Sequence, residues 1–321
     1  MEEVKSIDNV IEKDLLHVFI INSPMVVFVA KLLISTYGLK KENIVCYRLR
    51  KTDVSLLNCH NISNEISFFD RLFKRLTYRS SSGLRIKRSI ERMRRRFILY
   101  SGWDIPEVVE VLNSRLCAGQ AYLEEGQMAY NEYEIYSYNK DKSMQKKRLK
   151  EQFYSLKRIS PQTNEYEFQE YFNSRAFAFF GILHESFPHT PSHKRVILNN
   201  FADIKMSYKP KLLGVKNIGL TCSPRRLLPE ERKGAMKKLV SKLLDGGVIK
   251  LHPDFINNRQ LKKEMVRLIE EVSCGKVAVC CDSILIEAEM LFEEKLFFGP
   301  LTSTERYAKA LGSKFEAIKL Y

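Results

Sequence analysis

Two short polar motifs contain side chains suited to acid–base chemistry. Glu124-Glu125-Gly126 follows the apolar residues Ala121–Leu123, and Lys250-Leu251-His252-Pro253 follows Gly247–Ile249. A carboxylate before a glycine turn can act as general base on a sugar hydroxyl. A histidine held in extended geometry before a proline can present its ring to a phosphate and help it leave. Taken alone, either motif is better explained as an ordinary turn.

Two later segments add candidates for nucleotide binding. Glu287 lies one turn into a helix expected at 284–291, where its carboxylate could accept both hydroxyls of a ribose. Thr302-Ser303-Thr304 follows Gly299-Pro300, and hydroxyls with backbone N–H groups at a helix start can bind phosphate without a metal. A solvent-facing glutamate and simple N-capping are the structural alternatives. Further candidates are Asn22, Ser23 and Ser283.

Patterns of strands and helices alternate in two parts of the chain. Near the N-terminus, strands are expected at 17–22, 43–49 and 94–102 and at the start of 121–127, which runs into a tight acidic turn, with helices at 24–36, 68–76 and 106–116. After about residue 210, strands are expected at 217–223, 247–253, 276–281 and 295–299, with helices at 229–244, 259–272, 284–291 and 304–311. Such alternation predicts two parallel sheets, each covered on both faces. Ligands bind beyond the carboxyl ends of such strands, where the four motifs fall.

Composition limits the class of protein. A chain of 321 residues with 45% apolar content can bury two cores, and a net charge of +15 favours anionic partners. The seven cysteines contain no CxxC pair, which favours a reducing compartment. The first 14 residues lack the pattern of a signal peptide, and the apolar stretch 17–36 is interrupted by polar residues and a proline. We therefore expect a cytoplasmic protein.

The ordered set of motifs resembles that of bacterial sialyltransferases with two Rossmann domains, the lipooligosaccharide and capsule type similar to glycosyltransferase family 52. Their motifs read (D/E)(D/E)G, HP and S(S/T), matched here by Glu124-Glu125-Gly126, His252-Pro253 and Thr302-Ser303-Thr304. The resemblance covers the C-terminal half continuously and the N-terminal half mainly around 121–127. It differs in having Glu-Glu where pairs with Asp are commoner and Thr in place of the first Ser.

The resemblance implies an α/β protein of the GT-B fold, with two Rossmann-like domains facing a central cleft. Residues 1–209 would bind the acceptor and residues 210–321 the CMP-linked donor. Glu124 would be the base, with Glu125 as the alternative base and Gly126 as a further residue of the same site. His252 would act on the leaving phosphate, Glu287 would hold the ribose, and the remaining donor contacts would come from Lys250, Pro253, Thr302, Ser303 and Thr304.

The activity implied is an inverting transfer of sialic acid from CMP-sialic acid to a glycan, such as a lipid-linked lipooligosaccharide or capsule precursor. No DxD motif occurs in the chain, so we expect neither a metal nor another cofactor. Two alternatives keep the fold and change the donor to another CMP-linked sugar acid or to a UDP-hexose. Pocket shape decides among these donors, and sequence does not reveal it.

A dense basic run suggests a further partner. It contains Lys74, Arg79, Arg85, Lys87, Arg88, Arg92, Arg94, Arg95 and Arg96. On a transferase with a lipid-linked acceptor, such a run would hold the enzyme against the anionic inner face of the plasma membrane. A solvated basic surface is an equal alternative. A basic nucleic-acid-binding protein is the competing class, but no recognisable nucleic-acid module accompanies the charge, so no nucleic-acid partner is expected.

Overall fold

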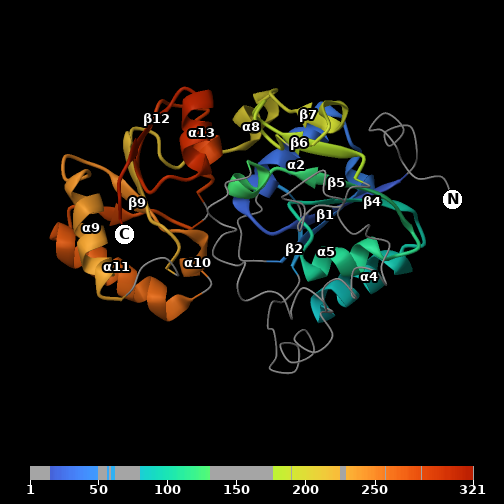
Figure 1. Cartoon of the computed structure of the whole chain (residues 1–321), viewed down its shortest axis with the longest axis horizontal. Helices are drawn as coiled ribbons and strands as arrows, with labels where there is room; N and C mark the ends of the chain where they lie inside the picture. The colour runs from blue at the N-terminus through green and yellow to red at the C-terminus, as the bar shows by residue number, and fades with distance from the viewer. Residues whose placement is uncertain are drawn as a thin grey trace. The chain divides into compact units, whose positions relative to one another are not determined.

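The chain forms two compact units in a computed structural model (Figure 1). The described residues are 15–49, 56–57, 59–61, 80–130, 176–188, 190–224, 229–256, 258–282 and 284–320. Within the described residues, the first unit runs to Asn200 and the main part of the second unit begins at Phe201. The division therefore falls before helix α8 (Ala202–Ser207) rather than after residue 209.

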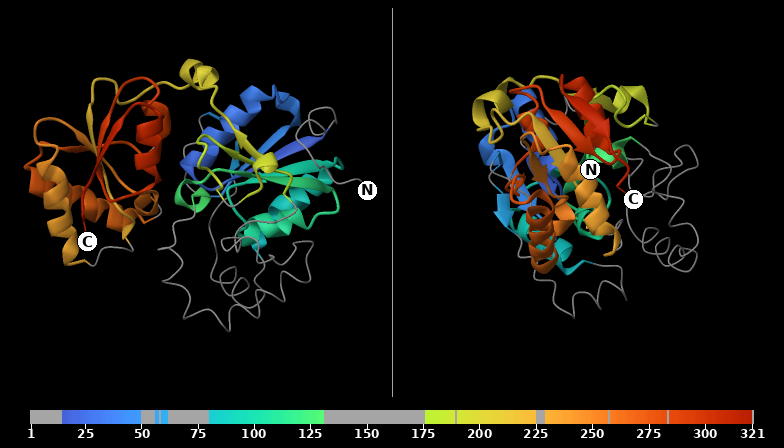
Figure 2. Two further views of the ribbon diagram at one scale, coloured as in Figure 1. Left: turned by 45° about the horizontal axis from the view of Figure 1, so that its top comes forward. Right: turned by 90° about the vertical axis from the view of Figure 1, so that its left-hand side faces the viewer.

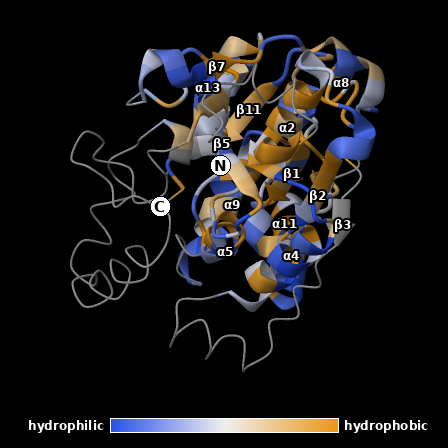
Figure 3. Cartoon of the chain, turned by 90° about the vertical axis from the view of Figure 1, so that its right-hand side faces the viewer, coloured by the Kyte–Doolittle hydropathy of each residue, from blue (hydrophilic) through white to orange (hydrophobic). Residues whose placement is uncertain are grey.

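The described strands of the first unit form one parallel sheet in the order β3-β2-β1-β4-β5-β6-β7. The strands are β1 (Leu16–Ile21), β2 (Ile44–Arg48), β3 (Cys59–Asn61), β4 (Phe97–Ser101), β5 (Cys117–Leu123), β6 (Ala178–Gly181) and β7 (Arg195–Ile197). Every residue of β1 is buried, as expected for a central parallel strand covered on both faces. Figure 3 shows the hydrophobic colour on β1 and β2.

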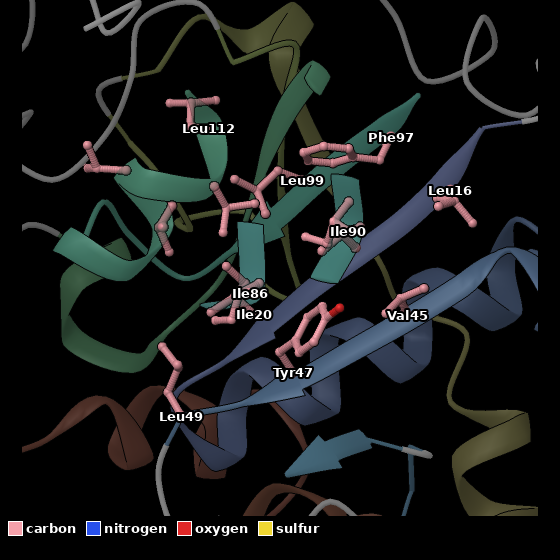
Figure 4. Packing of buried hydrophobic residues seen from close by; sticks show 14 residues of the cluster. Leu16, Ile20, Val45, Tyr47, Leu49, Ile86, Ile90, Phe97, Leu99 and Leu112 are labelled. Atoms are coloured by element: carbon pink, nitrogen blue, oxygen red, sulfur yellow. The ribbon is translucent and has the colours of Figure 1, made fainter. Parts of the chain in front are cut away.

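Helices cover both faces of this sheet. Helix α2 (Pro24–Thr36) lies on one face, and α4 (Ser81–Arg92) packs with α5 (Pro106–Leu112) on the other (Figure 1). Branched aliphatic side chains fill the second interface: Figure 4 shows Ile86 and Ile90 of α4 against Ile20 and Leu99 of the strands. Short 3-10 turns complete the unit at η1 (Lys41–Asn43), η2 (Gly126–Ala129) and η4 (Ser192–Lys194).

The second unit repeats the design with a smaller parallel sheet in the order β10-β9-β8-β11-β12. Its strands are β8 (Asn217–Leu220), β9 (Val248–Lys250), β10 (Ala278–Val279), β11 (Leu296–Gly299) and β12 (Lys314–Ala317). Besides α8, its helices are α9 (Glu231–Ser241), α10 (Pro253–Ile256), α11 (Arg259–Ser273), α12 (Ile286–Glu289) and α13 (Ser303–Ala310). Helices α9 and α11 pack together on one face, and α13 covers β12 (Figure 2).

The predicted alternation of strands and helices is confirmed in the described residues, with shifted ends. Strand β5 begins at Cys117, before the expected 121, and ends at Leu123, so Glu124-Glu125-Gly126 follows the strand as expected. Strands β3, β6, β7 and β12 were not predicted, and α4 was hidden within the basic run. The helix expected at 68–76 lies outside the described residues. No helix among the described residues is long and apolar enough to cross a membrane.

A buried polar pair sits inside the first sheet. His17 of β1 is 3% exposed, and its Nδ1 lies 3.0 Å from the hydroxyl of Tyr100 on the neighbouring β4. Burial lowers the pKa of His17 from 6.5 to about 4 and raises that of Tyr100. His17 is therefore neutral in the folded protein at pH values where it is protonated in the unfolded chain.

This pair makes stability depend on pH. The unfolded state binds the extra proton between the two pKa values, so folding stability falls as pH drops from 6.5 toward 4. When the pH is lowered from about 7 to about 5, the unfolding free energy of the wild type should fall by up to about 2 kcal/mol more than that of the His17→Gln variant. Urea denaturation of both proteins at the two pH values measures this difference. Equal losses in the two proteins would contradict a buried neutral His17.

Candidate functional site

Each sheet has one point where the strand order reverses. The reversal falls between β1 and β4 in the first unit and between β8 and β11 in the second. In open parallel sheets, helices leave toward opposite faces at this point and open a crevice beyond the carboxyl ends of the strands. The residues that follow these strands are therefore the ones whose geometry matters for ligand binding.

Glu124 follows β5 directly and is completely buried. Its Oε2 accepts hydrogen bonds from the backbone N–H of Ile182 at 2.7 Å and from the hydroxyl of Ser186 at 2.9 Å. Its Oε1 accepts a hydrogen bond from the hydroxyl of Tyr130. A carboxylate with three donors is a stable buried charge, because the donors replace the water it has lost. In this state the Glu124 carboxylate anchors the segments after β5 and β6.

Gly181, the last residue of β6, makes room for this cluster. A Cβ atom there would lie 2.4 Å from the Cβ of Ser186 and 3.1 Å from the Oε2 of Glu124. Both distances are too short for ordinary packing, so a side chain at 181 would force Ser186 away from the carboxylate. Glycine is therefore required at position 181, because Ser186 and Glu124 pack too closely against its backbone to leave room for a side chain.

Glu125 has a different environment from its neighbour. Its side chain is half-buried, and its Oε2 accepts a hydrogen bond of 2.8 Å from the Nδ2 of Asn22, the residue after β1. Gly102, which follows β4, lies beneath it: a Cβ atom there would be 2.4 Å from the same oxygen. The structure thus brings together the ends of three adjacent strands, β1, β4 and β5, around the Glu125 carboxylate.

Asn22 is held with its donor group toward Glu125. It is 4% exposed, and its Oδ1 has no hydrogen-bond partner in the described part of the chain. Rotating the amide would place Oδ1 against the carboxylate and lose the hydrogen bond, so the observed orientation is the favourable one. The other candidates nearby have backbone roles: Ser23 caps α2 by accepting from the N–H of Val26, and Gly126 adopts a φ of 55° after the acidic pair.

His252 follows β9 and is held from both sides. Its backbone N–H donates to the hydroxyl of Thr221, at the end of β8, at 2.8 Å. The backbone N–H of Asp254 donates to the ring Nδ1 of His252 at 3.2 Å, and the Asp254 carboxylate accepts from Ser223 at 2.7 Å. A neutral ring whose Nδ1 is an acceptor carries its proton on Nε2. This side chain is 37% exposed, so a ligand can reach it. Pro253 begins α10 beside it.

Lys250 ends β9 and links it to the loop after β10. Its ammonium group donates to the carbonyl oxygens of Asp282 at 2.8 Å and Cys281 at 3.3 Å. Burial lowers the pKa of Lys250, and the nearby charges of Asp282 and Glu287 oppose that shift. Glu287 on α12 is half-buried and close enough to interact electrostatically with Lys250. The predicted Lys250 and Glu287 therefore share one environment, while Ser283 lies outside the described residues.

Glu289, two residues later on α12, has a role that the sequence did not indicate. It is 1% exposed and accepts hydrogen bonds from the hydroxyl of Tyr208 and the backbone N–H groups of Lys211 and Leu212, at 2.7, 2.8 and 3.0 Å. Lys295, equally buried, donates to the carbonyl oxygen of Leu212 at 2.6 Å. The segment that leads from α8 into β8 is thus bonded to the helix that carries Glu287.

The predicted Thr302-Ser303-Thr304 segment starts α13, after β11. Thr302 is the N-cap, and its hydroxyl accepts from the backbone N–H of Thr304 at 3.3 Å. Strand β8 separates β9 from β11, so His252 and Thr302 follow strands that lie two strand spacings, about 10 Å, apart. A phosphate-linked nucleoside is long enough to contact both strand ends.

No metal centre is evident in the part of the chain that the structure describes. In those residues no group of three or more His, Cys, Asp or Glu side chains lies close enough to hold an ion. His184 and His193 are exposed, and His189 lies outside the described residues.

Comparison with known proteins establishes the fold. No protein-family model and no curated protein matches the chain. The S. aureus MnaA–UDP structure matches with a TM-score of 0.55 at 10% identity, covering 95% of this chain and 79% of that one. A putative UDP-N-acetylglucosamine 2-epimerase from Listeria monocytogenes gives 0.55 at 11% identity with the same coverages. UDP-GlcNAc 2-epimerase from Neisseria meningitidis bound to UDP-GlcNAc gives 0.51 at 10%, covering 95% and 83%. The chain therefore has the two-domain GT-B fold.

The tight packing at Gly181 can be tested by comparing an alanine substitution there with one at the uncrowded Gly234. Gly181→Ala should lower the unfolding free energy by about 1–3 kcal/mol, because the new methyl group overpacks the Ser186–Glu124 cluster. Gly234→Ala in α9 should raise it by about 0.5–1 kcal/mol, since no atom lies within 4 Å of the added Cβ and alanine favours a helix. Denaturant unfolding of both variants measures the two effects. A neutral Gly181→Ala would contradict the tight packing around Glu124.

Proposed function

We propose that this protein is a metal-independent glycosyltransferase that moves a sugar from a nucleotide donor to a hydroxyl group of an acceptor glycan. The observation that carries the proposal is the set of groups at the carboxyl edge of the second sheet. An imidazole, an ammonium group, a carboxylate and a hydroxyl-rich helix start collect there, from His252, Lys250, Glu287 and Thr302. These groups can bind a phosphate-linked nucleoside, because the imidazole, the ammonium group and the helix start suit phosphate and the carboxylate suits ribose hydroxyls.

His252 is suited to the leaving phosphate. Its Nδ1 is occupied by the N–H of Asp254, which leaves the Nε2–H as the donor for a phosphate oxygen. The Asp254 carboxylate lies 3.8 Å from the ring Nδ1 and is itself held by the hydroxyl of Ser223. The start of α13 adds hydroxyls and the positive end of the helix dipole. These interactions strengthen as charge develops on the phosphate, which is how a site can act without a metal.

Glu125 is the better candidate for the base, in place of Glu124. A base must reach the acceptor hydroxyl, and the Glu124 carboxylate is fully buried with three donors already bound. Glu125 is half-buried at the point where the strand order reverses, with Asn22 fixing one of its oxygens. In a single displacement, Glu125 takes the proton of the acceptor hydroxyl, that oxygen bonds to the anomeric carbon, and the nucleotide leaves with inversion.

Two donors remain compatible with this arrangement, and they have different support. A UDP-hexose is supported by the solved structures of similar fold, which include a complex with UDP, a putative UDP-N-acetylglucosamine 2-epimerase and a complex with UDP-GlcNAc. CMP-sialic acid is supported by the order of the Glu-Glu-Gly, His-Pro and Thr-Ser-Thr motifs in this chain. The fold likeness favours the uridine nucleotide, and the motif order favours the cytidine nucleotide.

Binding of free nucleotides tests the proposal. UDP or CMP should raise the melting temperature of the full chain, equally with and without chelator, by an amount that grows with ligand concentration. Stabilisation by UDP alone selects the uridine donor, and stabilisation by CMP alone the cytidine donor. If neither nucleotide has an effect, or if chelator abolishes it, the proposal is wrong. Conversion of UDP-N-acetylglucosamine to its 2-epimer without any acceptor would instead indicate an epimerase.

A matched pair of histidine variants controls this experiment. His252→Asn keeps a short acceptor for the N–H of Asp254 but removes the Nε2–H, so it should weaken nucleotide binding. His193→Asn changes an exposed histidine of the first unit and should leave nucleotide binding unchanged. Equal nucleotide affinity in the two variants would exclude a role for His252 in the donor site.

Variants of the two glutamates distinguish base from anchor. Glu125→Gln should reduce transfer by about 10²–10⁴-fold while nucleotide affinity and melting temperature stay near wild type. Glu124→Gln should lower the melting temperature, because an amide NH₂ then faces the donors of Ile182 or Tyr130. Product formation from whichever donor the binding experiment selects gives the rate. If the Glu124→Gln variant folds but loses transfer, while the Glu125→Gln variant keeps it, the base is Glu124.

A further inference from the structure

Helix α4 displays a row of arginines away from its core face. Ile86 and Ile90 are buried against the sheet, while Arg85, Arg88 and Arg92 are exposed. At 100° per residue, the three arginines lie within an arc of about 60° on the side opposite the isoleucines. Figure 3 shows the hydrophilic colour on this helix. We define these three arginines as the α4 basic face.

The α4 basic face is held on a rigid support. Ser80 caps α4 by accepting from the N–H of Gly83, and its own hydroxyl donates to Glu107 of α5 at 2.9 Å. Gly83 lets the two helices approach closely, because a Cβ atom there would lie 2.8 Å from the Cβ of Glu110. Lys87 donates to the carbonyl oxygen of Asn113 at 3.2 Å. The spacing of the arginines is therefore set by the fold.

The three arginines lack charge compensation in the described part of the chain. Among those residues no ion pair or hydrogen bond involves Arg85, Arg88 or Arg92, and the nearest acid, Glu91, bonds to Lys87 and Ser114. Arg88 is three residues from Arg85 and four from Arg92, separations at which like charges on a helix repel. Simple solubility does not require such a row, since mixed charges serve it equally well.

The basic surface continues beyond the end of α4. Arg94 and Arg115 are exposed, and they precede β4 and β5, so they lie at the amino ends of these strands. Met93, between Arg92 and Arg94, is 39% exposed. Asn22 and Glu125 lie at the opposite, carboxyl edge of the sheet. The donor and acceptor chemistry proposed above therefore does not account for the basic surface.

We propose that the α4 basic face docks the protein on an anionic lipid bilayer. A bilayer presents many negative headgroups in one plane, which matches arginines aligned along a helix of about 18 Å. Binding of single-stranded nucleic acid would need aromatic stacking platforms, and no aromatic residue is among the large exposed hydrophobics of the described chain.

Vesicle co-sedimentation of the full chain tests this proposal. One set of vesicles is phosphatidylcholine alone, and the other contains equal parts of phosphatidylcholine and phosphatidylglycerol. The wild type should bind only the second set, and high salt should release it. The triple variant Arg85→Gln, Arg88→Gln, Arg92→Gln should bind about 100-fold more weakly, since each arginine contributes about five-fold near an anionic surface.

A matched control separates this surface from net charge. Arg259, Lys263 and Arg267 are exposed on α11, where acids alternate with bases, and changing all three to Gln removes the same charge. This control should bind vesicles like the wild type, and all proteins should keep their melting temperatures and nucleotide responses. Equal loss in both triple variants, or no vesicle binding by the wild type, would overturn the proposal. So would loss of single-stranded RNA binding without loss of vesicle binding in the α4 variant.

Discussion

Parallel strand pairing is the constraint on which both units depend. Because β1 pairs in parallel with β2 and β4, and β8 with β9 and β11, every strand of a sheet delivers its next residue to the same edge. For this reason Asn22 lies beside Glu125 in the first unit, although the two residues are far apart in sequence. In the second unit, His252 lies beside Thr221 for the same reason. The sites therefore follow from backbone hydrogen bonding, and the local motifs only decide which chemistry is placed there.

The two edges differ in chemistry. In the first unit the edge offers the carboxylate of Glu125, while the carboxylate of Glu124 already accepts three hydrogen bonds. In the second unit it offers an imidazole, an ammonium group and a helix start, together with the carboxylate of Glu287. Carboxylates disfavour phosphate and suit hydroxyl groups, whereas the imidazole, the ammonium group and the helix start suit phosphate. This contrast supports a division of labour in which the nucleotide belongs to the second unit.

Sequence patterns predicted the strands with long apolar runs and missed those whose burial depends on distant partners. β1 was predicted because its sequence is an almost continuous apolar run. β3 and β7 were missed because each is only three residues long, too short to show a pattern. α4 was hidden because two isoleucines make up most of its buried apolar face. The roles of Glu124 and Glu125 could not be separated either. Adjacent residues have the same sequence context, and two of the three donors to Glu124 lie 58 and 62 positions away.

The Glu124 cluster has a consequence for how the first unit can change over evolution. Tyr130 and Ser186 bond to the Glu124 carboxylate through their side chains, so replacing either residue removes one of its donors. A buried acceptor that loses its donor costs about 1–3 kcal/mol. The three side chains should therefore vary together, because a single change is penalised whichever of them changes first.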